Sequence, residues 1–198
     1  MYRCFVALAL SLCASPAALA SEVGDVYVVA GATKFDYAVP EASGDTRATL
    51  GVGYQFSDHL AVELTAPAQA FESNVDQAGF GTLIQARYRP YNATVLFQLA
   101  PERMFSPYLG LGYAYIDTSL RAVGPLTGTR LDARENAGFS VRAGVDYNIA
   151  PHWFVRADVS RIESDLVIDA TVPGGPTGKI VDEPMHSTFY SLFVGYRF

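Results

Sequence analysis

The sequence predicts an all-β protein: an eight-stranded antiparallel up-and-down transmembrane β-barrel with short periplasmic turns and long extracellular loops. Apolar and polar residues alternate along eight segments, and the connections between these segments are alternately short and long. The chain also ends on an alternating strand that closes with Phe198. Half of the residues are hydrophobic, yet after residue 20 no apolar run approaches the roughly 18 residues that a membrane helix requires.

The first 20 residues have the features of a secretory signal peptide. Arg3 precedes an apolar run at residues 5–12, and Ala-Leu-Ala at residues 18–20 forms a cleavage site. We therefore expect residues 1–20 to be removed and residues 21–198 to form one barrel domain in the bacterial outer membrane. Both cysteines, Cys4 and Cys13, would be removed with the signal, so the mature chain has no disulfide to form.

The first three segments contain one weakly alternating strand and one hairpin. Residues 26–32 are apolar on both faces, because Tyr27 and Val29 lie between valines and alanines. Residues 47–56 alternate strictly between apolar residues and polar residues or glycines. A short turn at residues 57–59 leads to residues 60–66, which alternate again, so we expect a hairpin here.

The fourth segment, residues 81–99, changes phase halfway. Its apolar residues occupy even positions up to Tyr88 and odd positions from Ala93 onward. The change coincides with Pro90, which has no N–H to donate to a ladder, so we expect a bulge or a local break there. The fifth segment, residues 106–116, faces leucines and tyrosines outward and small residues inward.

The last three segments repeat the alternation. Residues 139–149 have apolar side chains at every odd position, and a turn at 150–152 leads into residues 153–160, which alternate in the same way. Residues 188–198 have apolar side chains at every even position from Tyr190 to Phe198. This ending resembles the C-terminal signal by which bacterial outer-membrane barrels are recognised, so we expect the barrel-assembly machinery to bind this strand.

The connections predict which end faces the cell. Short turns lie at residues 57–59, 100–104 and 150–152, whereas long polar or glycine- and proline-rich loops lie at residues 38–46, 70–81, 118–137 and 167–187. An even number of strands with both termini in the periplasm gives this alternation. We expect the sheet to close, because an open edge in hydrocarbon leaves unpaired N–H and C=O groups.

Six stretches carry a family resemblance, at residues 25–33, 53–64, 94–98, 106–113, 144–147 and 195–198. In this order, they resemble the OmpW family of small outer-membrane β-barrel proteins over nearly the whole mature chain. The resemblance implies an eight-stranded barrel whose narrow, partly hydrophobic interior passes small apolar molecules, in some members through a lateral opening. Two stretches depart from it: Val29 replaces a usual arginine, and Tyr-Asn-Ala-Thr at residues 91–94 replaces Leu-Pro-Pro-Thr.

Eight strands enclose an interior that side chains fill or that holds one small ligand, which argues against a water-filled general porin. Two interpretations of the inward residues remain open. In one, the charges pair as a structural plug, and the turn at 150–152 places Asp146 directly opposite Arg156. In the other, inward apolar residues, mostly toward the extracellular half, line a hydrophobic passage. The expected charge network is Glu63, Arg142, Asp146, Arg156 and Asp158, and the expected lining is Val29, Leu96, Tyr108, Ile116, Ile162, Phe189 and Phe193.

The long loops are a second candidate site. Their apolar residues either shape a hydrophobic entrance or pack within their own loops; they are Phe71, Val75 and Phe80 in one loop and Leu120, Val123, Leu126 and Leu131 in another. A hydrolase needs a nucleophile beside a base, but His186 and Ser187 are neighbours in an extended strand and point to opposite faces. We expect no enzymatic activity, no catalytic residue, no metal site and no cofactor.

Two functions remain after these observations. The first is an outer-membrane barrel that passes or binds small hydrophobic molecules through a narrow, partly apolar lumen. The alternative is a structural or surface-interaction barrel with a plugged lumen and functional extracellular loops. The expected partners are outer-membrane lipid and lipopolysaccharide, a small hydrophobic solute and the barrel-assembly machinery. The net charge of −6, without a basic cluster, argues against nucleic acid.

Overall fold

The computed structural model describes residues 24–37, 45–77, 81–101, 103–133, 136–171 and 177–198. The expected signal peptide, residues 1–20, lies outside the described residues. No helix in the described part of the chain is long and apolar enough to cross a membrane. The elements are β1 (Val26–Tyr37), β2 (Asp45–Ser57), β3 (Leu60–Pro67), β4 (Phe71–Gln77), β5 (Gly81–Gln98), β6 (Phe105–Ala122), the 3-10 helix η1 (Gly124–Leu126), β7 (Arg130–Ala133), β8 (Asn136–Asn148), β9 (Trp153–Thr171) and β10 (Thr177–Arg197).

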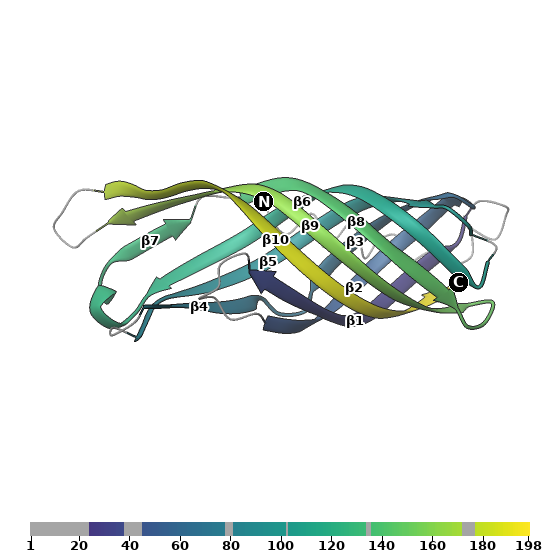
Figure 1. Cartoon of the computed structure of the whole chain (residues 1–198), viewed down its shortest axis with the longest axis horizontal. Coiled ribbons are helices and arrows are strands. Elements are labelled where there is room, and N and C mark those ends of the chain that lie inside the picture. Colours follow the sequence, from purple (N-terminus) through teal and green to yellow (C-terminus); the bar gives the residue numbers. More distant parts are fainter. Residues whose placement is uncertain (1–23, 38–44, 78–80, 102, 134–135, 172–176) are drawn as a thin grey trace.

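The strands close into an antiparallel barrel (Figure 1). Its ring has the order β1, β2, β3, β5, β6, β8, β9 and β10, and β10 returns to pair with β1. The closing ladder runs from Tyr27 opposite Arg197 to Phe35 opposite Phe189 and beyond. The eight-stranded barrel predicted from the sequence is confirmed. Closure satisfies the backbone N–H and C=O groups that would otherwise face hydrocarbon.

Two further strands extend the barrel wall on the extracellular side. β4 pairs with β5 beyond the end of β3, and β7 pairs with β9 beyond the end of β8. The bounds predicted for the loops at residues 70–81, 118–137 and 167–187 are therefore wrong, because strands occupy much of each range. Outside the hydrocarbon neither face must be apolar, so the alternation stops while backbone pairing continues. The short turns between β2 and β3, β5 and β6, and β8 and β9 are confirmed.

The sequence predicts a bulge or a local break at Pro90, but β5 itself has no bulge there. The ladder between β5 and β6 passes this position without a register shift, and the even-numbered residues of β5 face inward on both sides of it. The apolar phase changes because Ala86 and Tyr88, which face inward, are apolar. The interruption lies in the neighbouring strand: β3 pairs with β5 as far as Asn92, and β4 pairs from Tyr88 onward. Pro90 therefore stands where β5 has no ladder partner on that side and needs no N–H.

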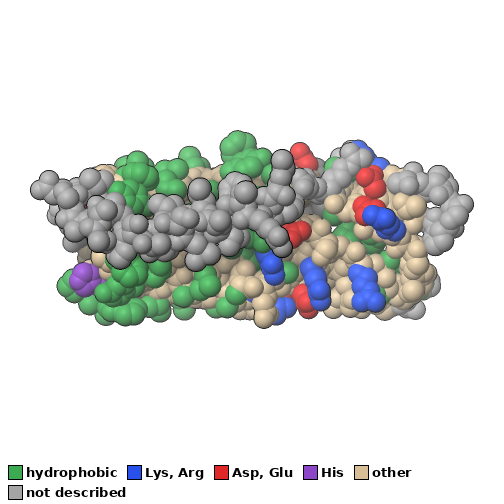
Figure 2. Space-filling view, turned by 180° about the vertical axis from the view of Figure 1, so that it is seen from behind, with side chains coloured by type: hydrophobic (Ala, Val, Ile, Leu, Met, Phe, Trp, Pro, Cys, Tyr) green, Lys and Arg blue, Asp and Glu red, His purple; other side chains and the backbone are tan. Residues whose placement is uncertain are grey.

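The outer surface divides into a hydrophobic belt and a charged end (Figure 2). Large apolar side chains of the belt are exposed on every strand of the ring, as expected for contact with lipid tails. They include Val28, Leu50, Leu64, Phe97, Leu111, Phe139, Val159 and Leu192. Charged side chains gather toward the extracellular end, whereas the short turns and the C-terminus lie at the opposite, periplasmic end. The belt thus defines the membrane-spanning part of the barrel.

Candidate functional site

The charge network lies in the periplasmic half of the lumen, and its side chains are at most 4% exposed. Arg156 donates to Asp146 through Nε at 2.6 Å and Nη2 at 2.8 Å, and its Nη1 donates to Glu63. Arg142 donates from Nη1 to the other Glu63 oxygen at 2.6 Å, and from Nε to Asp158 at 2.9 Å. Glu63 therefore joins the two arginines, and Asp146 lies opposite Arg156 in the ladder between β8 and β9, as predicted.

Aromatic rings enclose the network. The guanidinium carbon of Arg156 lies 4.8 Å from the ring centroid of Tyr108 and 5.2 Å from that of Phe154. Arg197, 3.8 Å from Asp146, adds a third arginine for the three carboxylates. Ions in a low-dielectric interior need such partners, because desolvating each one costs several kcal/mol. The network and the rings together close the lumen toward the periplasm.

Four of the expected lining residues pack around this network, not in the extracellular half where we expected most of them. They are Val29, Leu96, Tyr108 and Phe193, in one buried cluster with Tyr27, Ala61 and Phe154. Tyr108 also donates its hydroxyl hydrogen to Asp158 at 2.9 Å. Gly144 makes room for this contact, since a β-carbon there would lie 2.7 Å from the Tyr108 ring and from Asp158 Cβ. Inward apolar residues are therefore consistent with a structural plug as well as with a hydrophobic passage.

An aromatic layer closes the axis of the barrel on the extracellular side. Phe35 is its centre, with ring centroids 4.8 Å from Phe189, 5.7 Å from Phe71 and 5.8 Å from Tyr88. Ile116 and Ile162, both expected in the lining, lie in the same buried cluster, together with Ala86 and Ala114. Phe35 is not among the lining residues expected from the sequence, although it continues the inward register of Tyr27, Val29 and Thr33 along β1.

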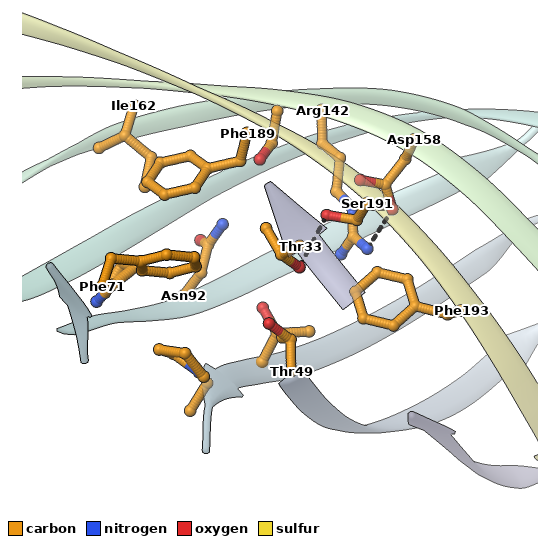
Figure 3. A pocket seen from close by; sticks show the side chains of 15 residues that line it. Thr33, Thr49, Phe71, Asn92, Arg142, Asp158, Ile162, Phe189, Ser191 and Phe193 are labelled. Carbon is orange, nitrogen blue, oxygen red and sulfur yellow. Dashed lines mark hydrogen bonds and ion pairs between the residues drawn. The ribbon is translucent and has the colours of Figure 1, made fainter. Parts of the chain in front are cut away.

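A small pocket of about 40 Å³ lies between the aromatic layer and the charge network (Figure 3). Phe71, Phe189 and Ile162 border it on one side, and Phe193 and the Arg142–Asp158 pair border it on the other. Hydroxyl groups lie between these two sides: Thr33 donates to Ser191 at 3.1 Å, whereas the buried hydroxyl of Thr49 has no hydrogen-bond partner among the described residues. The pocket is thus apolar at the end formed by the aromatic layer, ionic beside Phe193 at the other end, and lined by hydroxyl groups between the two.

The pocket also reaches the barrel wall at the interruption between β3 and β4. We call this place the wall gap; it is bordered by Ala66, Pro67, Phe71 and Pro90, all of which line the pocket. Ala66 shares the lipid-facing side of β3 with Leu64 and is also one of the residues that line the pocket. Neither β3 nor β4 pairs with β5 at Pro90, so backbone ladders do not seal the wall here.

Side chains link β2 to β4 beside the wall gap. The Glu72 backbone N–H donates to Asp45 Oδ2 at 2.7 Å, and Arg47 Nη2 lies 3.7 Å from Glu72 Oε2. Arg47 is in turn held by Asp45, with 2.8 Å between Nε and Oδ2. The ladder between β2 and β3 ends with Thr49 opposite Pro67, so these contacts stand where pairing has stopped. Exposed contacts of this kind separate more easily than a ladder.

The described loop residues that were expected either to form a hydrophobic entrance or to pack within their own loops lie in several places. Phe71 belongs to the aromatic layer, Leu120 packs against that layer, and Leu131 is buried on β7. Val123 and Leu126 are half-buried beside and within η1, Val75 pairs with Ile84 in the ladder between β4 and β5, and Phe80 lies outside the described residues.

The one histidine–serine pair considered from the sequence is separated as expected. Ser187 is buried on the inner face of β10, whereas His186 is exposed, with its Nδ1 3.6 Å from Glu163 Oε1. The serine hydroxyl therefore has no access to the neighbouring imidazole. These two side chains do not form the nucleophile and base of a hydrolase.

Comparisons with known sequences point to the outer membrane. A model of the outer membrane protein beta-barrel domain matches residues 5–198. An uncharacterized outer-membrane protein of Sinorhizobium fredii, y4mB, is 28% identical over 155 residues, which is 75% of this chain. The match spans 64% of the length of that curated relative.

Solved structures share the fold at low sequence identity. OprG from Pseudomonas aeruginosa has a TM-score of 0.70 at 21% identity, covering 89% of this chain and 97% of its own. AlkL in lipid bilayers has a TM-score of 0.71 at 19% identity, with coverages of 92% and 94%. Outer membrane protein W of E. coli has a TM-score of 0.55 at 21% identity, with coverages of 89% and 99%. The resemblance noted in the sequence is confirmed at the level of the fold.

Proposed function

Because the chain belongs to the outer membrane protein β-barrel family and lies in the bacterial outer membrane, we propose that it takes small hydrophobic molecules into the lumen pocket and releases them sideways through the wall gap. One observation carries this proposal. The pocket is closed toward the periplasm by the charge network but extends to Ala66 on the lipid-facing side of β3. The resemblance to the OmpW family leads to the same expectation of apolar cargo.

The charge network makes release along the axis unfavourable. A solute moving toward the periplasm would have to separate Arg156 from Asp146 and Glu63, whose side chains are at most 1% exposed. An apolar solute offers no replacement partner, and unpairing a buried ion pair costs about 3–5 kcal/mol. The wall gap has no such barrier, since Ala66, Pro67 and Pro90 are apolar and lie at the extracellular border of the hydrophobic belt, level with Tyr91.

The aromatic layer would select for apolar solutes. Its rings touch each other through faces and edges. A polar solute would lose its water on passing Phe35 and Phe189, whereas an apolar one would exchange one apolar contact for another. The free volume of about 40 Å³ means that rings must turn before a solute larger than a few atoms can enter.

The alternative function is a structural or surface-interaction barrel. The charge network favours this alternative, because paired ions and rings fill the periplasmic half of the lumen. In this case the aromatic layer never opens, and changes to its side chains leave transport unchanged. The two functions therefore differ in what a substitution within the aromatic layer does.

Phe189→Gln is expected to lower the uptake of an apolar fluorescent solute by proteoliposomes about tenfold, because the amide needs hydrogen bonds that neither the layer nor the solute supplies. Tyr190→Gln is the matched control, since the neighbouring Tyr190 is exposed on the outer face of the same strand. Uptake by the control should remain near that of the wild type. Folding of both variants is checked by the heat-dependent gel mobility of the barrel. Equal uptake by Phe189→Gln and the wild type would favour the structural alternative.

A further inference from the structure

Three arginines lie close together on the outer face of β5 and β6, at the extracellular border of the hydrophobic belt. We propose that Arg87, Arg89 and Arg121 form a binding surface for the phosphate groups of lipopolysaccharide in the outer leaflet. Figure 2 shows positively charged side chains gathered toward this end of the barrel, beyond the apolar surface. The proposal concerns the outside of the wall and does not depend on passage through the lumen.

The three arginines lie at the height of lipid headgroups. Tyr91 and Tyr115 face each other across the ladder of β5 and β6, with ring centroids 6.4 Å apart, and mark the border of the belt. Arg89 and Arg87 follow on the same face of β5, two and four residues further toward the extracellular end. At the rise of a β-strand these steps are about 7 and 13 Å. Anionic headgroups lie just outside the hydrocarbon, where such side chains reach them.

Among the described residues, two of the three arginines have no ion-pair partner. Arg87 is 3.1 Å from Glu72, whereas neither Arg89 nor Arg121 has a carboxylate within ion-pair distance among the described residues. Asp117 stands opposite Arg89 in the ladder, but no ion pair joins them. The Nε atom of Arg89 is buried and has no hydrogen-bond partner in the described part of the chain. Among the described residues, Glu72 and Asp117 are the acidic groups that face this surface, and they leave it with an excess of positive charge.

The register of the strands places these like charges side by side. Arg87 is opposite Ser119 and Arg121 is opposite Gln85, so Arg87 and Arg121 are diagonal neighbours, about 7–8 Å apart. Arg87 and Arg89 are next to each other on one face at a similar spacing. Neighbouring cations repel each other, and a ligand with several phosphates removes this repulsion. Guanidinium groups also bind phosphate oxygens in pairs, which favours arginine over lysine on such a surface.

A second outward-facing arginine, Arg161, differs from Arg89 and Arg121 because it has an ion-pair partner. On β9, Arg161 Nε lies 3.4 Å from Glu163, and His186 approaches the same carboxylate at 3.6 Å. Its positive charge is therefore neutralised within the protein. This site supplies a matched control, since it has an exposed arginine but no unpaired charge for a lipid phosphate.

The test measures binding of lipid A in neutral detergent micelles by thermophoresis of the barrel labelled at its N-terminus. Phosphorylated lipid A is compared with dephosphorylated lipid A carrying the same acyl chains. At low salt the double variant Arg89→Gln/Arg121→Gln is expected to bind phosphorylated lipid A about 30-fold more weakly than the wild type, or about fivefold for each arginine. Arg161→Gln should stay within about twofold of the wild type.

Two results would overturn the proposal. The first is equal binding of the two lipids by the wild type, which would mean that acyl chains alone hold the lipid. The second is equal binding of phosphorylated lipid A by the double variant and the wild type, which would place its phosphates elsewhere. Folding is checked by heat-dependent gel mobility. The comparison of the two lipids on the wild type decides the question even if the double variant does not fold.

Discussion

Arg156→Leu should lower the free energy of unfolding of the barrel by about 3–5 kcal/mol. The Arg156 side chain is 1% exposed and binds Asp146 and Glu63, each of which is fully buried. Among the described residues, its removal leaves Asp146 paired with Arg197 at 3.8 Å and Glu63 paired with Arg142. The rings of Tyr108 and Phe154 each lose one cation, whereas Arg142 remains 5.9 Å from Tyr108 and Arg197 remains 4.3 Å from Phe154. The leucine fills part of the volume but supplies no hydrogen-bond donor, so the carboxylates stay desolvated without compensation.

Urea unfolding of the barrel in lipid vesicles, followed by the fluorescence of its single tryptophan, Trp153, measures this change. Arg161→Leu is the matched control, because Arg161 lies on the same strand but is exposed and forms one pair of 3.4 Å. We expect the control to change stability by no more than about 1 kcal/mol. If Arg156→Leu is as stable as Arg161→Leu, the network does not hold the lumen together as described.

Ala66→Trp should reduce the uptake of an apolar solute about tenfold or more while leaving the barrel folded. Ala66 lines the pocket and lies on the lipid-facing side of β3, at the end of the ladder between β3 and β5. An indole at this position occupies the wall gap and still presents an apolar surface to lipid, so the expected loss concerns release and not stability. Solute would enter the pocket and find no exit.

Ala137→Trp provides the control for added bulk. Ala137 is exposed on β8 and faces Tyr115 across the ladder with β6, away from the wall gap. The same indole there should leave uptake near that of the wild type. Both variants are compared in the proteoliposome assay at equal amounts of folded barrel. Unchanged uptake by Ala66→Trp would mean that solutes do not leave at this gap.

The membrane-spanning strands and the charge network could be predicted because both depend on local alternation. A period of two assigns each residue to the lipid or to the lumen, and charges assigned to a narrow lumen must find partners there. Glu63, Arg142 and Asp158 come from three strands, yet the requirement for pairing brought them together in the prediction. The turn at 150–152 additionally fixed the register of Asp146 against Arg156.

The aromatic layer and the wall gap could not be predicted in this way. Alternation shows which face a residue occupies, but the height at which residues of distant strands meet depends on the stagger of the whole barrel. Phe35, Phe71 and Tyr88 come from β1, β4 and β5, and only their register places them in one layer. Pro90 did indicate an interruption, but its position in the neighbouring strand follows from pairing that one strand's sequence does not reveal.

Sideways release is the central claim, and one measurement tests it most directly. Vesicles containing lipopolysaccharide and the wild-type barrel receive an apolar dye that fluoresces only within lipid, together with a polar dye of similar size that is detected only inside the vesicle. We expect the apolar dye to reach the bilayer faster than in protein-free vesicles, while the polar dye stays outside. Entry of the polar dye into the interior at a comparable rate, or no acceleration of the apolar dye, would contradict sideways release.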